Sequence, residues 1–167
     1  MKFNRMIVMF CGPPGSGKTE IARKLAERLS GSKIISTANF KRRVCRHMFS
    51  EAEKHARSVK YLILDGTFYR QEWRDGIEEI AKRKGQEVIT VYLKCSLETC
   101  LRRNEARKNR IAERSVRIVY SQMEAPESPD IVIDTDILGV EAAVDVVLKF
   151  LASRPSFSPS EVVIHGN

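Results

Sequence analysis

The residues best suited to chemistry lie near the start of the chain, in the segment GPPGSGKT at residues 12–19. This segment fits the spacing G-x-x-x-x-G-K-[ST] without a mismatch. Glycines let main-chain N–H groups converge on an anion, and the start of a following helix adds partial positive charge. Lys18 is placed to reach the β- and γ-phosphates, and Thr19 to offer its hydroxyl to Mg²⁺. The segment therefore predicts a nucleoside triphosphate site made of Gly12, Pro13, Pro14, Gly15, Ser16, Gly17, Lys18 and Thr19.

The surroundings of this segment agree with a phosphate-binding loop. The apolar run RMIVMFC at residues 5–11 has the length and composition of a strand buried on both faces. After the loop, apolar side chains recur at helical spacing and charged side chains lie opposite them, until Gly31 ends the pattern. A strand, a glycine-rich loop and an amphipathic helix in this order are the context that the loop requires.

Strand-like and helix-like segments alternate through the rest of the chain. Apolar runs predict further strands at residues 33–36, 59–65, 87–94 and 130–134. Helical spacing predicts helices that begin near residues 39, 73, 97, 115 and 140, and the sequence SEAE at 50–53 predicts that the second helical region breaks and restarts there. This alternation predicts an α/β fold in which helices cover both faces of a parallel sheet.

The net charge of +8 is concentrated in two segments. Residues 41–60 hold seven Lys or Arg against two Glu, and residues 94–117 hold eight against three. Basic segments of this kind favour anionic ligands, either phosphates or nucleic acid. The alternative is that both are solvated faces of helices, which is what many charged runs prove to be.

Length and composition predict one globular domain of 167 residues, with residues 1–153 as the core and 154–167 as an irregular tail. The longest early apolar run is too short for a membrane span and lacks the features of a signal peptide. Cysteine spacing matches no zinc site, and it predicts buried thiols in a reducing, cytoplasmic compartment for Cys11, Cys45, Cys95 and Cys100. The sequence leaves the oligomeric state open.

The phosphate loop is shared by several classes of enzyme, and two features favour a kinase. A guanine-reading N-K-x-D sequence is absent, and large ATPases need a longer chain. A small domain with an arginine-dense segment late in the chain is typical of kinases, whose arginines close over the triphosphate during phosphoryl transfer.

Three segments together resemble a known family: GPPGSGKT, CLRRNEARK at residues 100–108, and EAPESPDIVIDT at residues 124–135. The chain is similar to the small P-loop kinases that include adenylyl-sulfate kinase, with polynucleotide 5′-kinases and seryl-tRNA kinases as more distant relations. The resemblance implies a P-loop NTPase three-layer sandwich with strand order 2-3-1-4-5 and an arginine-rich lid at about residues 102–116. It implies ATP and Mg²⁺ as cofactors.

The same resemblance assigns roles to the lid. Arg103 matches an arginine that lies against adenine in similar enzymes, although its neighbour is Asn104 where the family has Asp. Arg107 and Arg110 lie where lid arginines reach the phosphates. A solvated basic helix is the alternative for all three arginines.

Asp65 ends the third predicted strand, at the edge where open α/β sheets bind ligands. Its carboxylate could hold a Mg²⁺ water or take a proton from the acceptor, or it could cap the following turn. The segment DGTFYR at residues 65–70 resembles an adenylyl-sulfate kinase segment whose arginine, here Arg70, grips the acceptor. Through Asp65, Thr67 and Arg74 it also resembles a polynucleotide kinase pattern.

The segment after the second strand departs from the family. Adenylyl-sulfate kinases carry D-G-D-N-x-R there, whereas this chain reads STANFKR at residues 36–42. Asn39 matches and Arg42 lies one residue past the arginine, but both carboxylates are missing. The acceptor-side acid is therefore expected to be Asp65, or else the acceptor itself differs.

The sequence thus predicts an ATP- and Mg²⁺-dependent kinase that acts on a hydroxyl of a small nucleotide-type acceptor. Asn39, Arg42 and Arg70 are expected to bind this acceptor. A polynucleotide or seryl-tRNA-type kinase is the alternative, since the basic segments and the lost carboxylates suit nucleic acid. An ATP-gated RNA-binding switch is the alternative from another class.

Overall fold

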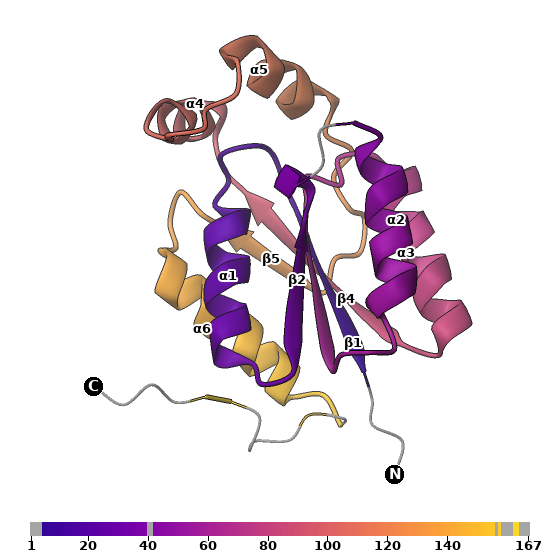
Figure 1. The fold of residues 1–167 in the computed structure, drawn as a ribbon. Coiled ribbons are helices and arrows are strands. Elements are labelled where there is room, and N and C mark those ends of the chain that lie inside the picture. The colour runs from indigo at the N-terminus through magenta and orange to yellow at the C-terminus, as the bar shows by residue number, and fades with distance from the viewer. Residues whose placement is uncertain (1–4, 40–41, 156, 158–161, 164–167) are drawn as a thin grey trace.

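The computed structural model describes residues 5–39, 42–155, 157 and 162–163. Its centre is one parallel sheet with the strand order β2-β3-β1-β4-β5 (Figure 1). The strands are β1 (Met6–Cys11), β2 (Ser32–Ser36), β3 (Tyr61–Asp65), β4 (Glu87–Lys94) and β5 (Ile131–Asp134). Both the α/β class and the predicted strand order are confirmed.

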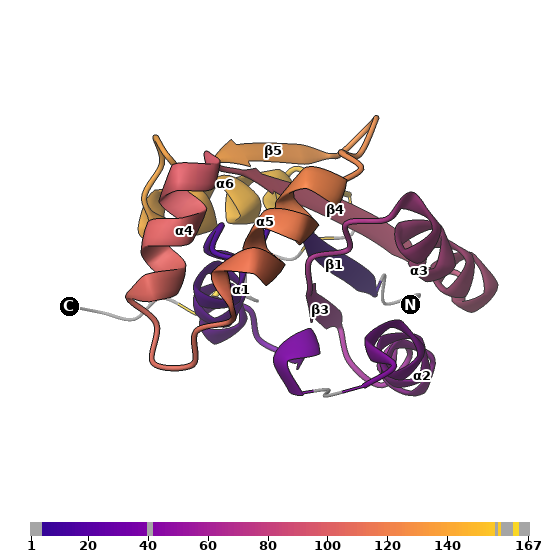
Figure 2. The ribbon, with the colours of Figure 1, turned by 90° about the horizontal axis from the view of Figure 1, so that it is seen from above.

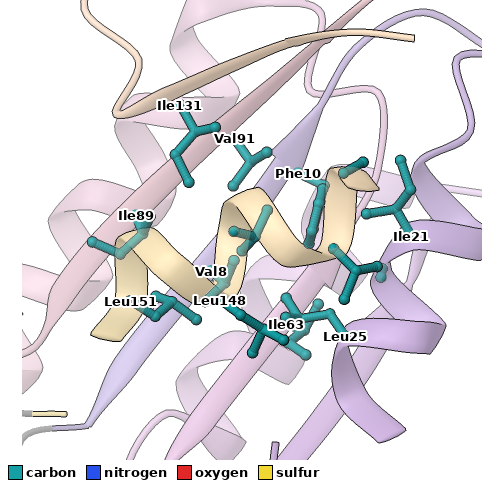
Figure 3. Packing of buried hydrophobic residues seen from close by; sticks show 14 of the residues in the cluster. Val8, Phe10, Ile21, Leu25, Ile63, Ile89, Val91, Ile131, Leu148 and Leu151 are labelled. Atoms are coloured by element: carbon teal, nitrogen blue, oxygen red, sulfur yellow. The ribbon is translucent and has the colours of Figure 1, made fainter. Parts of the chain in front are cut away.

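Helices cover both faces of this sheet. They are α1 (Lys18–Arg28), α2 (Val44–His55), α3 (Gln71–Lys84), α4 (Leu97–Glu105), α5 (Glu113–Gln122) and α6 (Val140–Ala152), with a short 3₁₀ turn η1 at Thr37–Asn39. Alternate residues of β1 face opposite layers, because successive side chains of a strand point to opposite faces. Met6, Val8 and Phe10 pack with α1 and α6, while Ile7, Met9 and Cys11 pack with α2 and α3. Figure 3 shows the first of these layers.

The parallel arrangement places the carboxyl ends of all five strands at one edge of the sheet. The glycine-rich loop follows β1 there, and Asp65 ends β3 beside it. Helices α4 and α5 lie across the same edge when the molecule is viewed from above (Figure 2). The fold therefore brings the glycine-rich loop, Asp65 and helices α4 and α5 to one edge of the sheet.

Two local predictions are wrong. Helix α2 runs without a break through Ser50, because Met48 and Ala52 are both buried in the core and hold one continuous helix. Cys95 and Cys100 are joined by a disulfide, which leaves Cys11 and Cys45 as free thiols.

Part of the predicted tail packs on the domain. Val162 forms a bridge with Leu29, and the main-chain N–H of Val163 donates to the carbonyl of Arg28. Within the part of the chain that the structure describes, no helix is both long and apolar enough to cross a membrane.

Candidate active site

The glycine-rich loop has a backbone that its sequence makes possible. Gly15 has φ 84° and Gly17 has φ 94°, which are left-handed values that side chains with a Cβ rarely adopt. A Cβ at Gly15 would also lie 2.5 Å from the carbonyl oxygen of Cys100 in α4. Helix α1 begins at Lys18, so its first N–H groups have no acceptor within the helix and face the end of the loop. This is the arrangement that binds phosphate groups.

Lys18 is buried inside the loop, with 7% of its surface exposed. Its Nζ donates to the carbonyl oxygen of Pro13 at 2.8 Å and to Oγ of Ser16 at 3.2 Å. The pKa of Lys18 is lowered to about 8, mainly by burial; the carboxylate of Asp65 partly opposes this shift, and the positive charge of Arg107 contributes to it. The ammonium group is therefore held in place by the loop, and a bound phosphate would raise its pKa again.

Three oxygen-bearing side chains meet at the end of β3. Thr19 Oγ1 and Ser36 Oγ each donate to Oδ2 of Asp65, both at 2.8 Å. Asp65 is almost fully buried. Carboxylate and hydroxyl oxygens next to a phosphate loop are the donor set that Mg²⁺ uses, with phosphates and water completing its shell. Among the described residues no three His, Cys, Asp or Glu side chains form a metal cluster.

Arg103 joins the lid to the loop and to the end of β5. Its guanidinium donates to the carbonyl oxygen of Gly15 at 3.3 Å and to the hydroxyl and carbonyl oxygens of Thr135 at 3.0 and 2.7 Å. The Thr135 hydroxyl in turn donates to the carbonyl oxygen of Ser16 at 2.9 Å. These bonds fix Arg103 at the rim of the loop, so it is not a freely solvated side chain.

Two cavities meet at Arg103. One of about 340 Å³ lies over α1 and the start of α6, between Glu20 and Ile21 on one side and residues 135–140 on the other. Ile137 lines it and is 82% exposed, which makes it available to cover a flat ring. The second cavity, of about 500 Å³, lies beside Thr19 and is bordered by Arg107. We call the first the base pocket and the second the phosphate-tail cavity, after the roles that the family resemblance implies for Arg103 and Arg107.

The lid loop is the segment between α4 and α5, and the side chain of Asn104 joins its beginning to its end. Its Nδ2 donates to the carbonyl oxygen of Ile111 at 2.8 Å, and its Oδ1 accepts from the N–H of Ile111 at 3.1 Å. Only an amide can make both bonds, because an ionised Asp has no donor. The departure from the family at this position therefore has a structural role.

The two other lid arginines differ in their position. Arg107 borders the phosphate-tail cavity and lowers the pKa of Lys18, so it lies near the loop. Arg110 is exposed on the same lid loop, and it does not line either of the two nucleotide cavities. It is not brought to the loop in this conformation.

The residues predicted to bind the acceptor lie on the α2 and α3 side. Arg42 is exposed between η1 and α2, and Asn39 is the last residue of η1, its side chain lying outside the described part. Arg70 precedes α3, with its guanidinium carbon 5.5 Å from the centre of the Tyr69 ring. No hydrogen bond joins the described side chains of Arg42 and Arg70 to Lys18 or Asp65.

A third cavity, of about 200 Å³, lies under the loop on that same layer. Pro13 borders it, and Tyr92, Lys94, Tyr120 and Met123 form its walls. Tyr120 donates its hydroxyl to the carbonyl oxygen of Cys95, which holds α5 against the end of β4. Two aromatic rings and a lysine suit a flat ligand that carries negative charge.

Arg74, which the polynucleotide kinase pattern had suggested, has another role. It is buried, and its guanidinium donates to the carbonyl oxygens of Phe68 and Glu124 and to Oε1 of Gln71. It therefore ties the β3–α3 loop to the segment before β5.

Sequence reasoning missed three polar residues of the site. Ser36, like Thr19, donates a hydrogen bond to Asp65. Thr135 accepts a hydrogen bond from Arg103, which also donates to the loop. Asp136 accepts from the main-chain N–H of Ser96 at 2.8 Å, and hydrogen bonds from Thr99 and Ser96 lower its pKa. The available signal was their position, since each lies at the carboxyl end of a predicted strand.

Comparison with known proteins identifies the family of the chain. The family model described as an AAA domain matches residues 7–127, which is more than half of the chain. A protein named "Probable adenylyl-sulfate kinase" from Halalkalibacterium halodurans is 31% identical, covering 93% of this chain and 88% of that protein. An L-seryl-tRNA(Sec) kinase from Mus musculus is 27% identical, covering 52% of this chain but 26% of that protein.

Solved structures agree in fold. The structure of Mycobacterium tuberculosis APS kinase CysC in complex with AMPPNP and APS has a TM-score of 0.70 at 21% identity, covering 90% of this chain and 99% of that one. Chaetomium thermophilum Kti12 in complex with ADP-AlF3 has a TM-score of 0.73 at 16% identity, covering 86% and 97%. At these identities the likeness concerns the fold alone.

Proposed function

The chain belongs to the AAA-domain family of P-loop kinases, and we propose that it transfers the γ-phosphoryl group of ATP to a hydroxyl of a small nucleotide-type acceptor. The observation that carries this proposal is the position of Asp65. It ends β3 beside the loop, where its carboxylate accepts hydrogen bonds from Thr19 and Ser36 and lies close enough to Lys18 to affect the pKa of that side chain. A γ-phosphoryl group bound by Lys18 would therefore lie near the Asp65 carboxylate.

The nucleotide side of the reaction rests on the loop and the lid. Main-chain N–H groups of residues 15–19 bind the β-phosphate, and Lys18 offsets the charge of the γ-phosphate. Arg103 lies against the adenine, and Arg107 and Arg110 close over the phosphates. Thr19 and Asp65 would hold Mg²⁺, which would neutralise negative charge on the phosphates. Catalysis by these groups is positioning and charge stabilisation, without a covalent intermediate.

In this proposal the acceptor is bound by Asp65 and by residues on the α2 and α3 side of the sheet. Asp65 orients the acceptor hydroxyl or accepts its proton, a role left to it by the missing carboxylates at residues 36–38. Asn39, Arg42 and Arg70 bind the acceptor's negative charge, and Tyr92 and Tyr120 contact its ring. The adenylyl-sulfate kinase names among the relatives support an anionic nucleotide as acceptor.

The experiment is incubation of the purified protein with γ-labelled ATP, Mg²⁺ and a panel of acceptors: adenylyl sulfate, nucleosides, sugars, serine and oligonucleotides. We expect label on a nucleotide-type acceptor, and no label with the Lys18→Ala variant. Label on a sugar or on serine alone would contradict the acceptor class. ATP-dependent RNA binding without any labelled product would favour the nucleotide-gated switch instead.

A further inference from the structure

Helix α2 carries a row of basic side chains on the side that faces away from the protein. Arg46 and Lys54 lie about two helical turns apart on α2, and both are exposed. Arg43 precedes the helix and Arg57 follows it, so these two residues extend the row at both ends. Met48 and Ala52 lie on the opposite side of the helix and are buried in the core. At 1.5 Å per residue the row is about 20 Å long. We call Arg43, Arg46, Lys54 and Arg57 the α2 basic row.

The acidic residues of the same helix do not neutralise this row. Glu53 forms ion pairs with Arg83 and Lys84 of α3, and Glu51 lies 3.3 Å from His55. In the part of the chain that the structure describes, no carboxylate forms an ion pair with any member of the α2 basic row. The row is therefore a line of uncompensated positive charge.

The row begins next to the acceptor side of the candidate site. Val44 and Cys45, in the first turn of α2, line a small apolar pocket together with Thr67 and Phe68, which follow Asp65 closely. Figure 1 shows the start of α2 at the same end of the sheet as the glycine-rich loop. Arg43 itself has φ 48°, a left-handed conformation that is rare for residues other than glycine and is kept only where the surrounding structure holds it.

We propose that the α2 basic row binds the phosphodiester backbone of a nucleic acid strand whose terminal nucleotide enters the acceptor side of the site. This inference rests on the proposed function, which it deepens by making the acceptor nucleotide the end of a strand. A strand that follows the row places several phosphates along it, and each Lys or Arg that neutralises a phosphate releases a counterion. An anionic membrane is a poorer fit, because surface-bound helices insert an apolar face into the lipid, and the apolar face of α2 is used in the core.

Binding is tested by fluorescence anisotropy with labelled single-stranded RNA and DNA oligonucleotides of one sequence, in the presence of Mg²⁺ and a non-hydrolysable ATP analogue. With four phosphate contacts the affinity of the wild type should fall roughly 50-fold between about 50 and 200 mM salt. The variant Arg46→Gln, Lys54→Gln, Arg57→Gln should lose most of this dependence, with a fall of only about threefold. The variant Lys33→Gln, Lys82→Gln, Lys149→Gln removes the same charge from exposed positions elsewhere and should behave like the wild type.

The outcomes separate this inference from the proposed function. Equal oligonucleotide affinity and salt dependence in all three proteins would overturn it, as would row-dependent binding to anionic lipid vesicles but not to oligonucleotides. The higher of the affinities for the RNA and DNA oligonucleotides identifies which kind of strand the row binds. Phosphorylation of a mononucleotide acceptor should continue in the row variant while phosphorylation of the oligonucleotide end is lost. If the wild type labels no acceptor but still shows row-dependent oligonucleotide binding, the proposed function fails and the binding surface stands.

Discussion

The hydroxyl of Thr19 donates a 2.8 Å hydrogen bond to Oδ2 of Asp65, joining the first turn of α1 to the end of β3. The two residues are far apart in sequence, and the parallel order of β1 and β3 brings them together. The same carboxylate oxygen also accepts from Ser36 at the end of β2. The ends of β2 and β3 and the first turn of α1 are thus connected at one carboxylate oxygen, which is also the atom proposed to face the metal and the acceptor.

Replacing Asp65 with Asn should lower kcat/KM by about 10²- to 10⁴-fold. The amide oxygen can still accept from Thr19 and Ser36, so the fold is expected to persist, but the negative charge and the proton acceptor are lost. Steady-state kinetics at several Mg²⁺ concentrations measures this, with Asp145→Asn on the exposed side of α6 as the control. An Asp65→Asn variant with normal turnover would remove this residue from the mechanism and leave it as a cap of the following turn.

ATP affinity should depend on pH through Lys18, whose pKa in the free protein is lowered to about 8. Bound phosphate stabilises the ammonium form, so the pKa is higher in the complex. Below pH about 8 the side chain is charged in both states and affinity is constant; above this pH, binding must take up a proton and affinity falls. The terminal phosphate of ATP loses its last proton at pH about 6, so its titration does not overlap with that of Lys18. Equilibrium titration with a fluorescent ATP analogue measures the effect, which should vanish in Lys18→Ala.

Replacing Thr135 with Val should raise the KM for ATP and lower the free energy of unfolding by about 1–3 kcal/mol. The methyl group fills the space of the hydroxyl, but the carbonyl of Ser16 loses its donor and Arg103 loses one acceptor. Denaturant unfolding and kinetics at varied ATP test the two effects. Thr90→Val, at another buried threonine on the sheet, should leave the KM unchanged.

Replacing Asn104 with Asp should loosen the lid loop. The carboxylate cannot donate to the carbonyl of Ile111, and the loss of that bond in a buried position costs about 1–3 kcal/mol. The loop holds three trypsin sites at Arg107, Lys108 and Arg110, so limited proteolysis should become roughly 5- to 100-fold faster, as the local opening free energy falls. The change Asn109→Asp, on the exposed part of the same loop, is the matched control. Equal cleavage rates in the two variants would show that Asn104 does not hold the loop.

Much of the fold could be predicted because its signals are local. The buried strand before the glycine-rich loop, the helix after it and the later apolar runs all correspond to observed elements. The break expected at Ser50 failed because a capping sequence is a weak local preference, and the burial of Met48 and Ala52 outweighs it. The pairing of Cys95 with Cys100 was missed for a similar reason, since their closeness depends on how α4 follows β4.

The candidate site was predictable where a motif fixes both residue type and position. Lys18, Thr19 and Asp65 fall into this group, and the structure brings them together, although their chemical roles remain proposals. Ser36 and Thr135 were not found, because a single hydroxyl carries no pattern until the sheet places it beside its partner. Arg110 shows the opposite limit: a lid arginine can be recognised from sequence, but its reach depends on a loop conformation that the sequence does not specify.

The close approach of Gly15 to the backbone of Cys100 limits how this enzyme can move. No side chain separates the phosphate loop from the first turn of α4, and the disulfide at Cys100 anchors that turn to the end of β4. The base of the lid is therefore a fixed platform, and any swing over a ligand has to hinge beyond Arg103. The mobile arm is then the short stretch at residues 106–112, so opening and closing would displace two arginines and a lysine while the walls of the base pocket stay still.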